Sequence, residues 1–310
     1  MEAFLAEIRA LPRRLPGLWP FLAALTCWLA LFHFFGNATF GYVKTPSLYG
    51  WMYEAYTSSS RDDGHGLLIP FVVLGLLWWK REEWLSAEKR PWPAGLAAVA
   101  AATALHILGY AVQLPRISIA ALFLGGYGLA LTMWGPRFAR RILFPYALFV
   151  FCIPMSALAE PITVPLRMLS TNIAAFVARD VLGVPIVQVG VQMFNPNGAY
   201  SYEVAAACSG IRSMIALSAL TAIFAMVYFR KPWKRLVVIS LAIPLALTAN
   251  VARLIAIIVA AEALGEEAGM FVHNWFGFVT FAGAIAALIW IERLWREPER
   301  SPESGGGKGG

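Results

Sequence analysis

Charged residues are scarce in this chain. Asp, Glu, Lys and Arg make up 14% of the 310 residues, against 59% hydrophobic residues, whereas a soluble domain carries about 25% charged residues. So few charges cannot cover a globular surface, and the remaining solvent must be lipid. The charges stand in short runs between long apolar segments, which is typical of a protein that crosses the membrane several times. We therefore expect a polytopic integral membrane protein.

Cysteines and metal-binding motifs are scarce as well. Cys27, Cys152 and Cys208 are too few for a disulfide framework. The sequence contains neither HExxH nor CxxC, and its four histidines are spread over four of the expected spans, so we expect no metal and no cofactor. The net charge of +7 does not indicate nucleic-acid binding, because the basic residues gather at the ends of apolar segments.

The apolar segments predict an all-α helical bundle. A spanning helix needs about 20 mainly apolar residues, and about eight segments meet or approach that length. We expect no cleaved signal peptide, because the first apolar run is long enough to be retained as a span. With no internal repeat and no second domain in view, residues 1–300 are expected to form one transmembrane domain, followed by a flexible cytoplasmic tail at 301–310. The expected spans are roughly 18–36, 64–79, 94–113, 117–135, 142–159, 205–229, 236–264 and 273–291.

Basic residues mark every other connection between these spans. Under the positive-inside rule this alternation places both termini in the cytoplasm, and an even number of spans agrees with it. We therefore expect an inner (plasma) membrane protein in contact with membrane lipid. The basic groups are Arg9, Arg13 and Arg14; Lys80, Arg81, Lys89 and Arg90; Arg137, Arg140 and Arg141; Arg230, Lys231, Lys234 and Arg235; and Arg293, Arg296 and Arg300.

The long connection at 160–204 is expected to lie outside the membrane. PLRMLSTNIAAFVARDVLG predicts an amphipathic helix at the interface, with Arg167, Asn172 and Arg179 on its polar side. VPIVQVGVQMF alternates well enough for one or two short strands, and NPNG is a turn signal. Because a strand needs a partner, we expect a small hairpin over the outer mouth of the bundle.

Three polar residues stand inside or at the edge of apolar spans. Polar groups there are costly and are functional candidates. Cys208 lies about one turn inside the span that enters from outside at 205, and His273 opens the last span. Arg253 lies 17 residues after Leu236, or roughly 26 Å along a helix, in the outer part of a core of about 30 Å. All three are thus expected at one depth near the outer face.

These three residue types suit nucleophilic catalysis. A cysteine thiolate is the nucleophile, His serves as general acid and base, and Arg stabilises an oxyanion at any physiological pH. Arg212 shares a helix face with Cys208 and is expected to lower the thiol pKa, to bind a substrate carboxylate, or to pair with Glu203. Asn250 shares the face of Arg253. Ser209, together with Glu203, completes the group expected to line or support the site.

At these residues the sequence resembles the exosortase/archaeosortase family. The matching stretches are GHGLLIPFVVLGLLWW, RRILFPYALFVFCIP, PLRMLS, EVAAACSGIRS, IPLALTANVARL and HNWFGFVTF, and they follow the order of the family. The resemblance implies a membrane cysteine protease or transpeptidase with Cys208, Arg253 and His273 as its catalytic residues. His65 matches another recurring position of the family. The chain departs from the pattern at Asp63 and Gly64, where many members have an aromatic residue and Ser, and at Ala206, where an acidic residue is common.

The resemblance also implies the partners of the protein. They are exported proteins with a C-terminal sorting signal, made of a short motif of the PEP type, a transmembrane helix and a basic cluster, together with an acyl acceptor. Two other functions compete with this one, a membrane transporter and a non-catalytic assembly factor for exopolysaccharide. The absence of repeat symmetry and a polar site on one side of the membrane favour the enzyme over the transporter.

Overall fold

The computed structural model describes residues 2–39, 43–58, 63–196, 201–202 and 211–295. These residues are mostly helical, which confirms the expected all-α class. The chain divides into two compact units, residues 1–158 and residues 159–310. A single functional membrane domain over 1–300 stays a prediction, and each unit is described by itself below.

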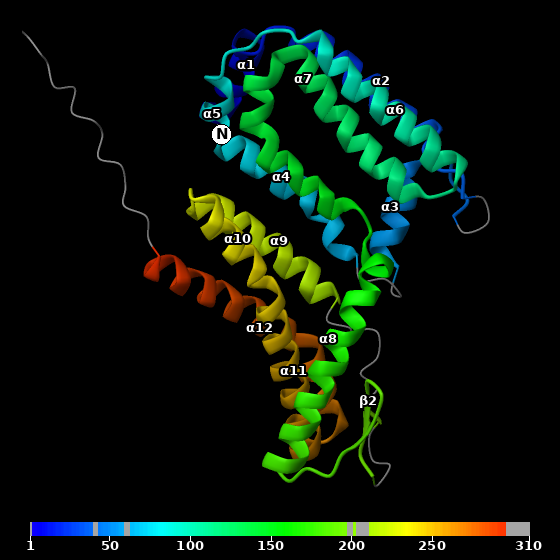
Figure 1. Ribbon diagram of the computed structural model, residues 1–310, viewed down its shortest axis with the longest axis vertical. Coiled ribbons are helices and arrows are strands. Elements are labelled where there is room, and N and C mark those ends of the chain that lie inside the picture. Colours follow the sequence, from blue (N-terminus) through cyan, green and yellow to red (C-terminus); the bar gives the residue numbers. More distant parts are fainter. Residues whose placement is uncertain (1, 40–42, 59–62, 197–200, 203–210, 296–310) are drawn as a thin grey trace, which may run out of the picture. The chain divides into compact units, whose positions relative to one another are not determined.

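The N-terminal unit contains short and long helices that pack around aromatic side chains. Trp28 and Phe32 lie in its main core with Ile119 and Leu122, and the Trp28 indole donates a hydrogen bond to the Leu122 carbonyl, 2.9 Å away. The elements are α1 Glu2–Arg14, α2 Leu18–Phe34, α3 Leu48–Thr57, η1 Gly64–Leu67, α4 Ile69–Trp79, α5 Arg81–Leu85, η2 Pro93–Gly95, α6 Leu96–Ala111, α7 Pro115–Ala147 and η3 Leu148–Cys152 (Figure 1).

Helix α7 is a hairpin of two arms that turns back at Gly135. This residue has φ 80° and ψ 177°, which side chains with a Cβ rarely adopt. Ring contacts join the arms in antiparallel register: Phe123 lies 4.4 Å from Phe149, and Tyr127 lies 5.4 Å from Tyr146 between ring centroids. Figure 1 shows the reversal in green. The two arms correspond to the separate segments expected at 117–135 and 142–159.

The second of those expected segments is not one continuous helix. The helical part ends at Cys152, because Ile153 is extended (φ −78°, ψ 119°) before Pro154. A new helix, α8 Ser156–Phe176, begins after this break. The predicted boundary at 159 is therefore wrong, since the proline interrupts the apolar run.

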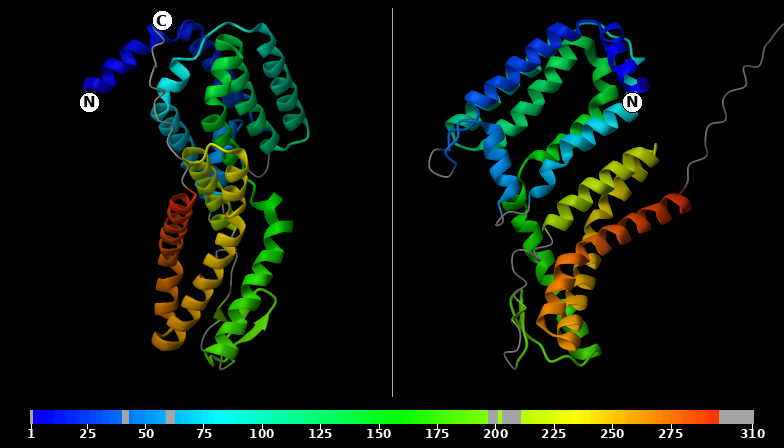
Figure 2. Two further views of the ribbon diagram at one scale, coloured as in Figure 1. Left: turned by 60° about the vertical axis from the view of Figure 1, so that its left-hand side comes forward. Right: turned by 180° about the vertical axis from the view of Figure 1, so that it is seen from behind.

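The C-terminal unit consists of helices and a small sheet. Its elements after α8 are the π-helical turn η4 Val177–Val181, β1 Val187–Val189, β2 Gln192–Phe194, β3 Ser201–Tyr202, α9 Ile211–Tyr228, α10 Pro232–Ser240, α11 Ala242–Leu264 and α12 Glu266–Leu294. Figure 2 shows α11 and α12 as an antiparallel pair from two further sides. Gly265, at φ 93°, joins these two helices.

The expected β-hairpin is present. β1 and β2 pair antiparallel, with Val187 opposite Phe194 and Val189 opposite Gln192, and β3 adds a third strand that the sequence did not predict. Met193 and Ile186 pack in a core cluster with Ala178 and Ile258, so the sheet is seated against α11. The expected turn at 195–198 extends outside the described residues.

Several helices are long and apolar enough to cross a membrane. In the described part of the chain four segments meet this condition, Pro93–Ala111, Pro115–Cys152, Pro232–Leu264 and Glu266–Leu294, and three shorter apolar helices accompany them. Large apolar side chains such as Trp275, Phe278 and Trp290 are exposed on α12, as lipid-facing side chains are. The polytopic class is confirmed, and the count of eight spans stays a prediction.

Three basic segments meet at one end of the N-terminal unit. Arg14 at the end of α1 pairs with Glu82, 2.6 Å away, and its hydrogen bond lowers the pKa of the Glu82 carboxyl. Arg137, at the α7 reversal, pairs with Glu88. The three basic segments therefore share one face of this unit, near residues 14, 80–90 and 137. The prediction that all three are cytoplasmic requires such a shared face.

Candidate functional site

The predicted catalytic residues belong to the C-terminal unit. Arg253 lies in the middle of α11, and His273 lies in α12. Cys208, Ser209 and Glu203 lie outside the described residues. Arg212 is the second residue of α9, but its side chain also lies outside the described part of the structure. Two of the three predicted catalytic residues can thus be located.

Arg253 and His273 are brought together by the α11–α12 hairpin. The Arg253 Nη2 donates a hydrogen bond to the backbone carbonyl of His273, 2.8 Å away. The two helices approach closely because Gly269 faces Ala261, whose Cβ would lie 2.8 Å from a Cβ added at the glycine. The sequence predicted the meeting of these two residues from depth alone. The hydrogen bond from Arg253 is accepted by the backbone carbonyl of His273.

The start of α12 differs from the expectation. The helix begins at Glu266, seven positions before His273, where the last span was expected to open. Two features explain the early start: Gly265 provides the N-cap, and Glu266 and Glu267 place negative charge in the first turn, where the helix dipole favours it. His273 is therefore held within a regular helix.

Part of the Arg253 guanidinium is buried without a partner among the residues that the structure describes. Its Nε is buried and has no hydrogen-bond partner among the described residues. Asn250, one turn earlier on α11, is also buried. A guanidinium has five N–H donors in a fixed fork. Arg253 uses one of them on the His273 carbonyl, and its Nε–H has no acceptor among the described residues.

Two more buried donors lie on α8. The Arg167 Nε and the Thr171 hydroxyl are buried with no hydrogen-bond partner among the described residues, and Thr171 is only 1% exposed. Their spacing of four residues puts them on one helix face. The sequence placed Arg167 on a polar face and missed Thr171. The (i, i+4) spacing of the two was the available signal.

The face of α8 that carries these donors continues toward α11. Ala174 and Ala178 extend the stripe and pack in one cluster with Leu254 and Ile258. Both helices run in the same direction (Figure 1, Figure 2). The preceding turn of α8, with Thr171, therefore lies near the depth of Asn250 and Arg253. Such N–H and O–H donors are suited to binding carbonyl oxygens or a developing oxyanion.

His65 belongs to the N-terminal unit, in η1. Next to it, Asp63 is buried and its Oδ1 accepts a hydrogen bond from the backbone N–H of Met155, 3.0 Å away. Asp63, one of the departures from the family pattern, thus ties η1 to the chain before α8. No metal-binding group of three or more His, Cys, Asp or Glu side chains occurs within the residues that the structure describes.

Comparison with known proteins gives one result. The family model described as transmembrane exosortase (Exosortase_EpsH) matches residues 57–290, which is well over half of the chain and includes positions 208, 253 and 273. No curated protein and no solved structure matches the chain.

Proposed function

We propose that this chain, which belongs to the transmembrane exosortase family, is a membrane cysteine protease or transpeptidase that acts through a thioester on Cys208. Membership of the family makes it a membrane protein with a protein-sorting role. The proposed substrates are exported proteins whose C-terminal signal consists of a short PEP-like motif, a transmembrane helix and a basic cluster. The proposed active unit is one domain over residues 1–300.

The contact between Arg253 and His273 carries this proposal. Two residues 20 positions apart, each in its own membrane-length helix, are joined by a hydrogen bond of 2.8 Å. An Arg whose Nε is buried with no partner among the described residues is a costly feature in lipid. It is expected where negative charge develops during a reaction. In the sequence, Cys208 stands three positions before Ile211, the first residue of α9.

The proposed reaction has two acyl-transfer steps. The Cys208 thiolate attacks the carbonyl carbon of the scissile peptide bond, and the carbonyl oxygen takes up the negative charge, which Arg253 stabilises. His273 gives a proton to the leaving nitrogen as the C–N bond breaks, which leaves a thioester on Cys208. An amine acceptor or water then attacks the thioester carbon and releases the thiolate of Cys208. The acceptor's proton returns to His273.

The surrounding residues have supporting roles in this proposal. Arg212 and Glu203 flank Cys208 in sequence, and Ser209 follows it, so that they line or support the nucleophile. Asn250 orients Arg253. The site lies near the outer face of the inner membrane, and the substrate helix enters from the lipid, which brings the bond just outside that helix level with the thiolate.

Mass spectrometry of a co-expressed substrate tests the proposal. The substrate would carry a C-terminal sorting signal from the same genome, and its new C-terminus would be sequenced. Wild-type chain should produce a product cut just before the signal's transmembrane helix, and Cys208→Ala should leave the substrate intact. Cys27→Ala is the matched control, because Cys27 is an exposed thiol in α2. Complete processing by Cys208→Ala would favour the transporter or the assembly factor.

A further inference from the structure

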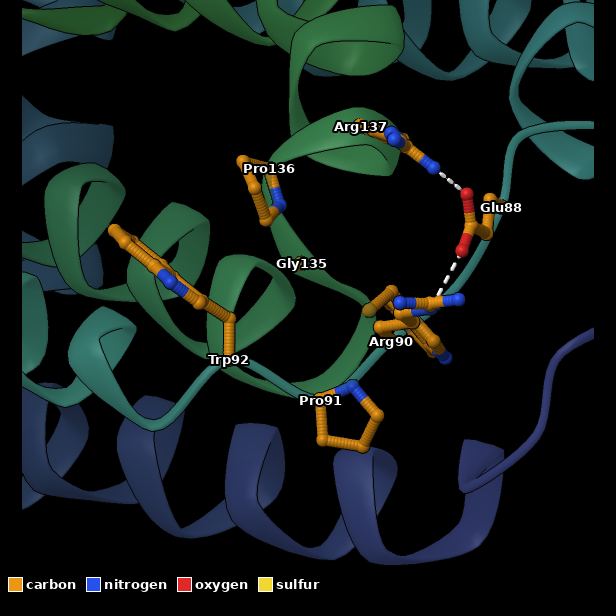
Figure 3. Close-up of a pocket in the computed structure, with 8 residues that line it drawn as sticks. Glu88, Arg90, Pro91, Trp92, Gly135, Pro136 and Arg137 are labelled. Carbon is orange, nitrogen blue, oxygen red and sulfur yellow. Dashed lines mark ion pairs between the residues drawn. The ribbon is translucent and has the colours of Figure 1, made fainter.

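A pocket opens in the N-terminal unit where several membrane-length segments end. It has a volume of about 280 Å³, and its lining includes Glu88, Arg90, Trp92, Gly135 and Arg137. Residues 88–92 precede the segment Pro93–Ala111, and Gly135 is the reversal point within Pro115–Cys152. Three apolar helical stretches therefore end or begin at this pocket (Figure 3). Such a place lies at the boundary between lipid tails and headgroups.

The pocket carries more positive than negative charge. Arg90 Nε lies 2.5 Å from Glu88 Oε1, and Arg137 Nη1 contacts the other oxygen of the same carboxylate. Figure 3 shows the Glu88 carboxyl group between the two guanidinium groups. Two cations share one anion, and each guanidinium has five N–H donors. The side chains of Arg90 and Arg137 are 84% and 72% exposed, so most of these donors face outward.

The backbone fixes the two arginines relative to each other. Arg90 N–H donates to the Trp134 carbonyl at 3.2 Å, and Trp92 N–H donates to the Thr132 carbonyl at 2.8 Å. A Cβ at Gly135 would lie 2.4 Å from the Arg90 carbonyl oxygen, so only glycine allows this approach. These two backbone hydrogen bonds hold residues 90–92, which precede α6, against the part of α7 that precedes its reversal at Gly135. The two guanidinium groups are thus brought to the same pocket before any ligand binds.

Aromatic side chains line the apolar part of the pocket. The Trp134 ring is buried and its indole N–H donates to the Pro16 carbonyl, 2.8 Å away, whereas the Trp92 ring is partly exposed. An exposed indole at the end of a spanning segment is typical of the headgroup region. The neighbouring Lys89 lies apart from this lining, because its ammonium group donates to the Leu85 and Ala87 carbonyls.

We propose that this pocket binds the phosphate group of an anionic phospholipid. Arg90 and Arg137 donate hydrogen bonds to the phosphate oxygens, and the ring of Trp92 packs beside the glycerol region. Planar guanidinium groups match phosphate geometry, and basic pockets between spanning helices bind anionic headgroups. A lipid is favoured over free phosphate because the pocket adjoins three apolar segments, which accommodate the acyl chains.

Native mass spectrometry of the full-length chain in neutral detergent tests this site. The probes are phosphatidylglycerol, phosphatidylcholine with the same acyl chains, and inorganic phosphate as a competitor. The chain should prefer phosphatidylglycerol, and the double variant Arg90→Gln/Arg137→Gln should lose about tenfold or more of that affinity. Arg141→Gln is the matched control, since Arg141 is exposed in the same basic connection but lies outside the lining. It should stay within about twofold of wild type.

The outcomes are distinct and do not depend on cleavage activity. An equal loss of phosphatidylglycerol affinity in the double variant and in Arg141→Gln would indicate diffuse attraction to a basic surface and would overturn the proposed site. An unchanged affinity in the double variant would also overturn it. Displacement of the lipid by millimolar inorganic phosphate would overturn the assignment to a lipid. If the double variant does not fold, the single Arg90→Gln, with its exposed side chain, carries the same test.

Discussion

At the scale of single residues, the buried donors of the C-terminal unit are the main finding. The Arg253 Nε, the Arg167 Nε and the Thr171 hydroxyl are buried without partners among the described residues. A buried donor left unpaired costs about 1–3 kcal/mol. In the proposed enzyme these donors bind the carbonyl oxygens of the substrate.

Arg253→Lys tests whether the planar guanidinium is needed. In the proposed mechanism, Arg253 donates one N–H to the His273 carbonyl and others to the oxyanion. The ammonium group of a lysine cannot reach both acceptors in that geometry. We expect single-turnover cleavage to fall by about 10²-fold or more. Arg230→Lys, at the exposed basic connection before α10, is the control and should cleave normally. If Arg253→Lys retains a third of the wild-type rate, charge alone is sufficient.

Thr171→Val tests whether the buried hydroxyl lacks a partner in the free protein. The change keeps the shape and removes a hydroxyl with no partner among the described residues, so the free energy of unfolding should rise by about 1 kcal/mol or stay the same. Ser170→Ala is the control: its hydroxyl donates to the Leu166 carbonyl at 2.9 Å, and its loss should destabilise. Thermal unfolding compares the two, and a lower melting temperature for Thr171→Val would refute an unpaired hydroxyl.

At the scale of elements, the strand alternation and the place of one connection were readable from the sequence, but breaks within helical runs were not. Alternation in VPIVQVGVQMF predicted the β1–β2 hairpin, and the Gly135-Pro136 pair falls where the sequence placed a connection between two spans. The break before Ser156 was missed, because hydropathy continues through Pro154. The early start of α12 was also missed, because Glu266 and Glu267 are polar yet helical. The spacing of Arg167 and Thr171 puts them on one helix face, but the burial of that face depends on tertiary packing, which no local pattern encodes.

Gly265→Ala tests the hairpin that joins Arg253 to His273. Gly265 has φ 93° and ψ 173°, a conformation that is nearly restricted to glycine. No atom lies within 4 Å of a Cβ added there, so the cost should be backbone strain alone, about 1–3 kcal/mol. Gly277→Ala is the control, because it lies within α12 and its added Cβ also meets nothing within 4 Å. It should be neutral or stabilising in thermal unfolding. Equal melting temperatures for the two variants would contradict the described turn.

At the scale of the whole molecule, the distribution of basic residues predicts the topology. In the N-terminal unit, ion pairs join Arg14 to Glu82 and Arg137 to Glu88, so three basic segments occupy one face. In a membrane, the three basic segments would therefore lie on the same side of the bilayer. The positive-inside rule makes that side cytoplasmic. The same rule puts the 160–204 connection outside.

Labelling of single cysteines in a cysteine-free background tests this topology. Asn197→Cys, in the predicted external connection, should react with a membrane-impermeant maleimide in intact cells. Lys231→Cys, in the basic connection before α10, should react only after the membrane is permeabilised. Reaction of position 197 only after permeabilisation would reverse the topology. It would also remove the argument that the site lies near the outer face.

The most direct test of the account is to trap the acyl-enzyme and map it. A substrate with a C-terminal sorting signal would be incubated with the purified chain, quenched in acid to preserve thioesters, and analysed by peptide mass spectrometry. The account predicts a substrate fragment on Cys208 that hydroxylamine releases and that Cys208→Ala does not form. An adduct on any other residue, or cleavage by Cys208→Ala at the wild-type rate, would contradict it.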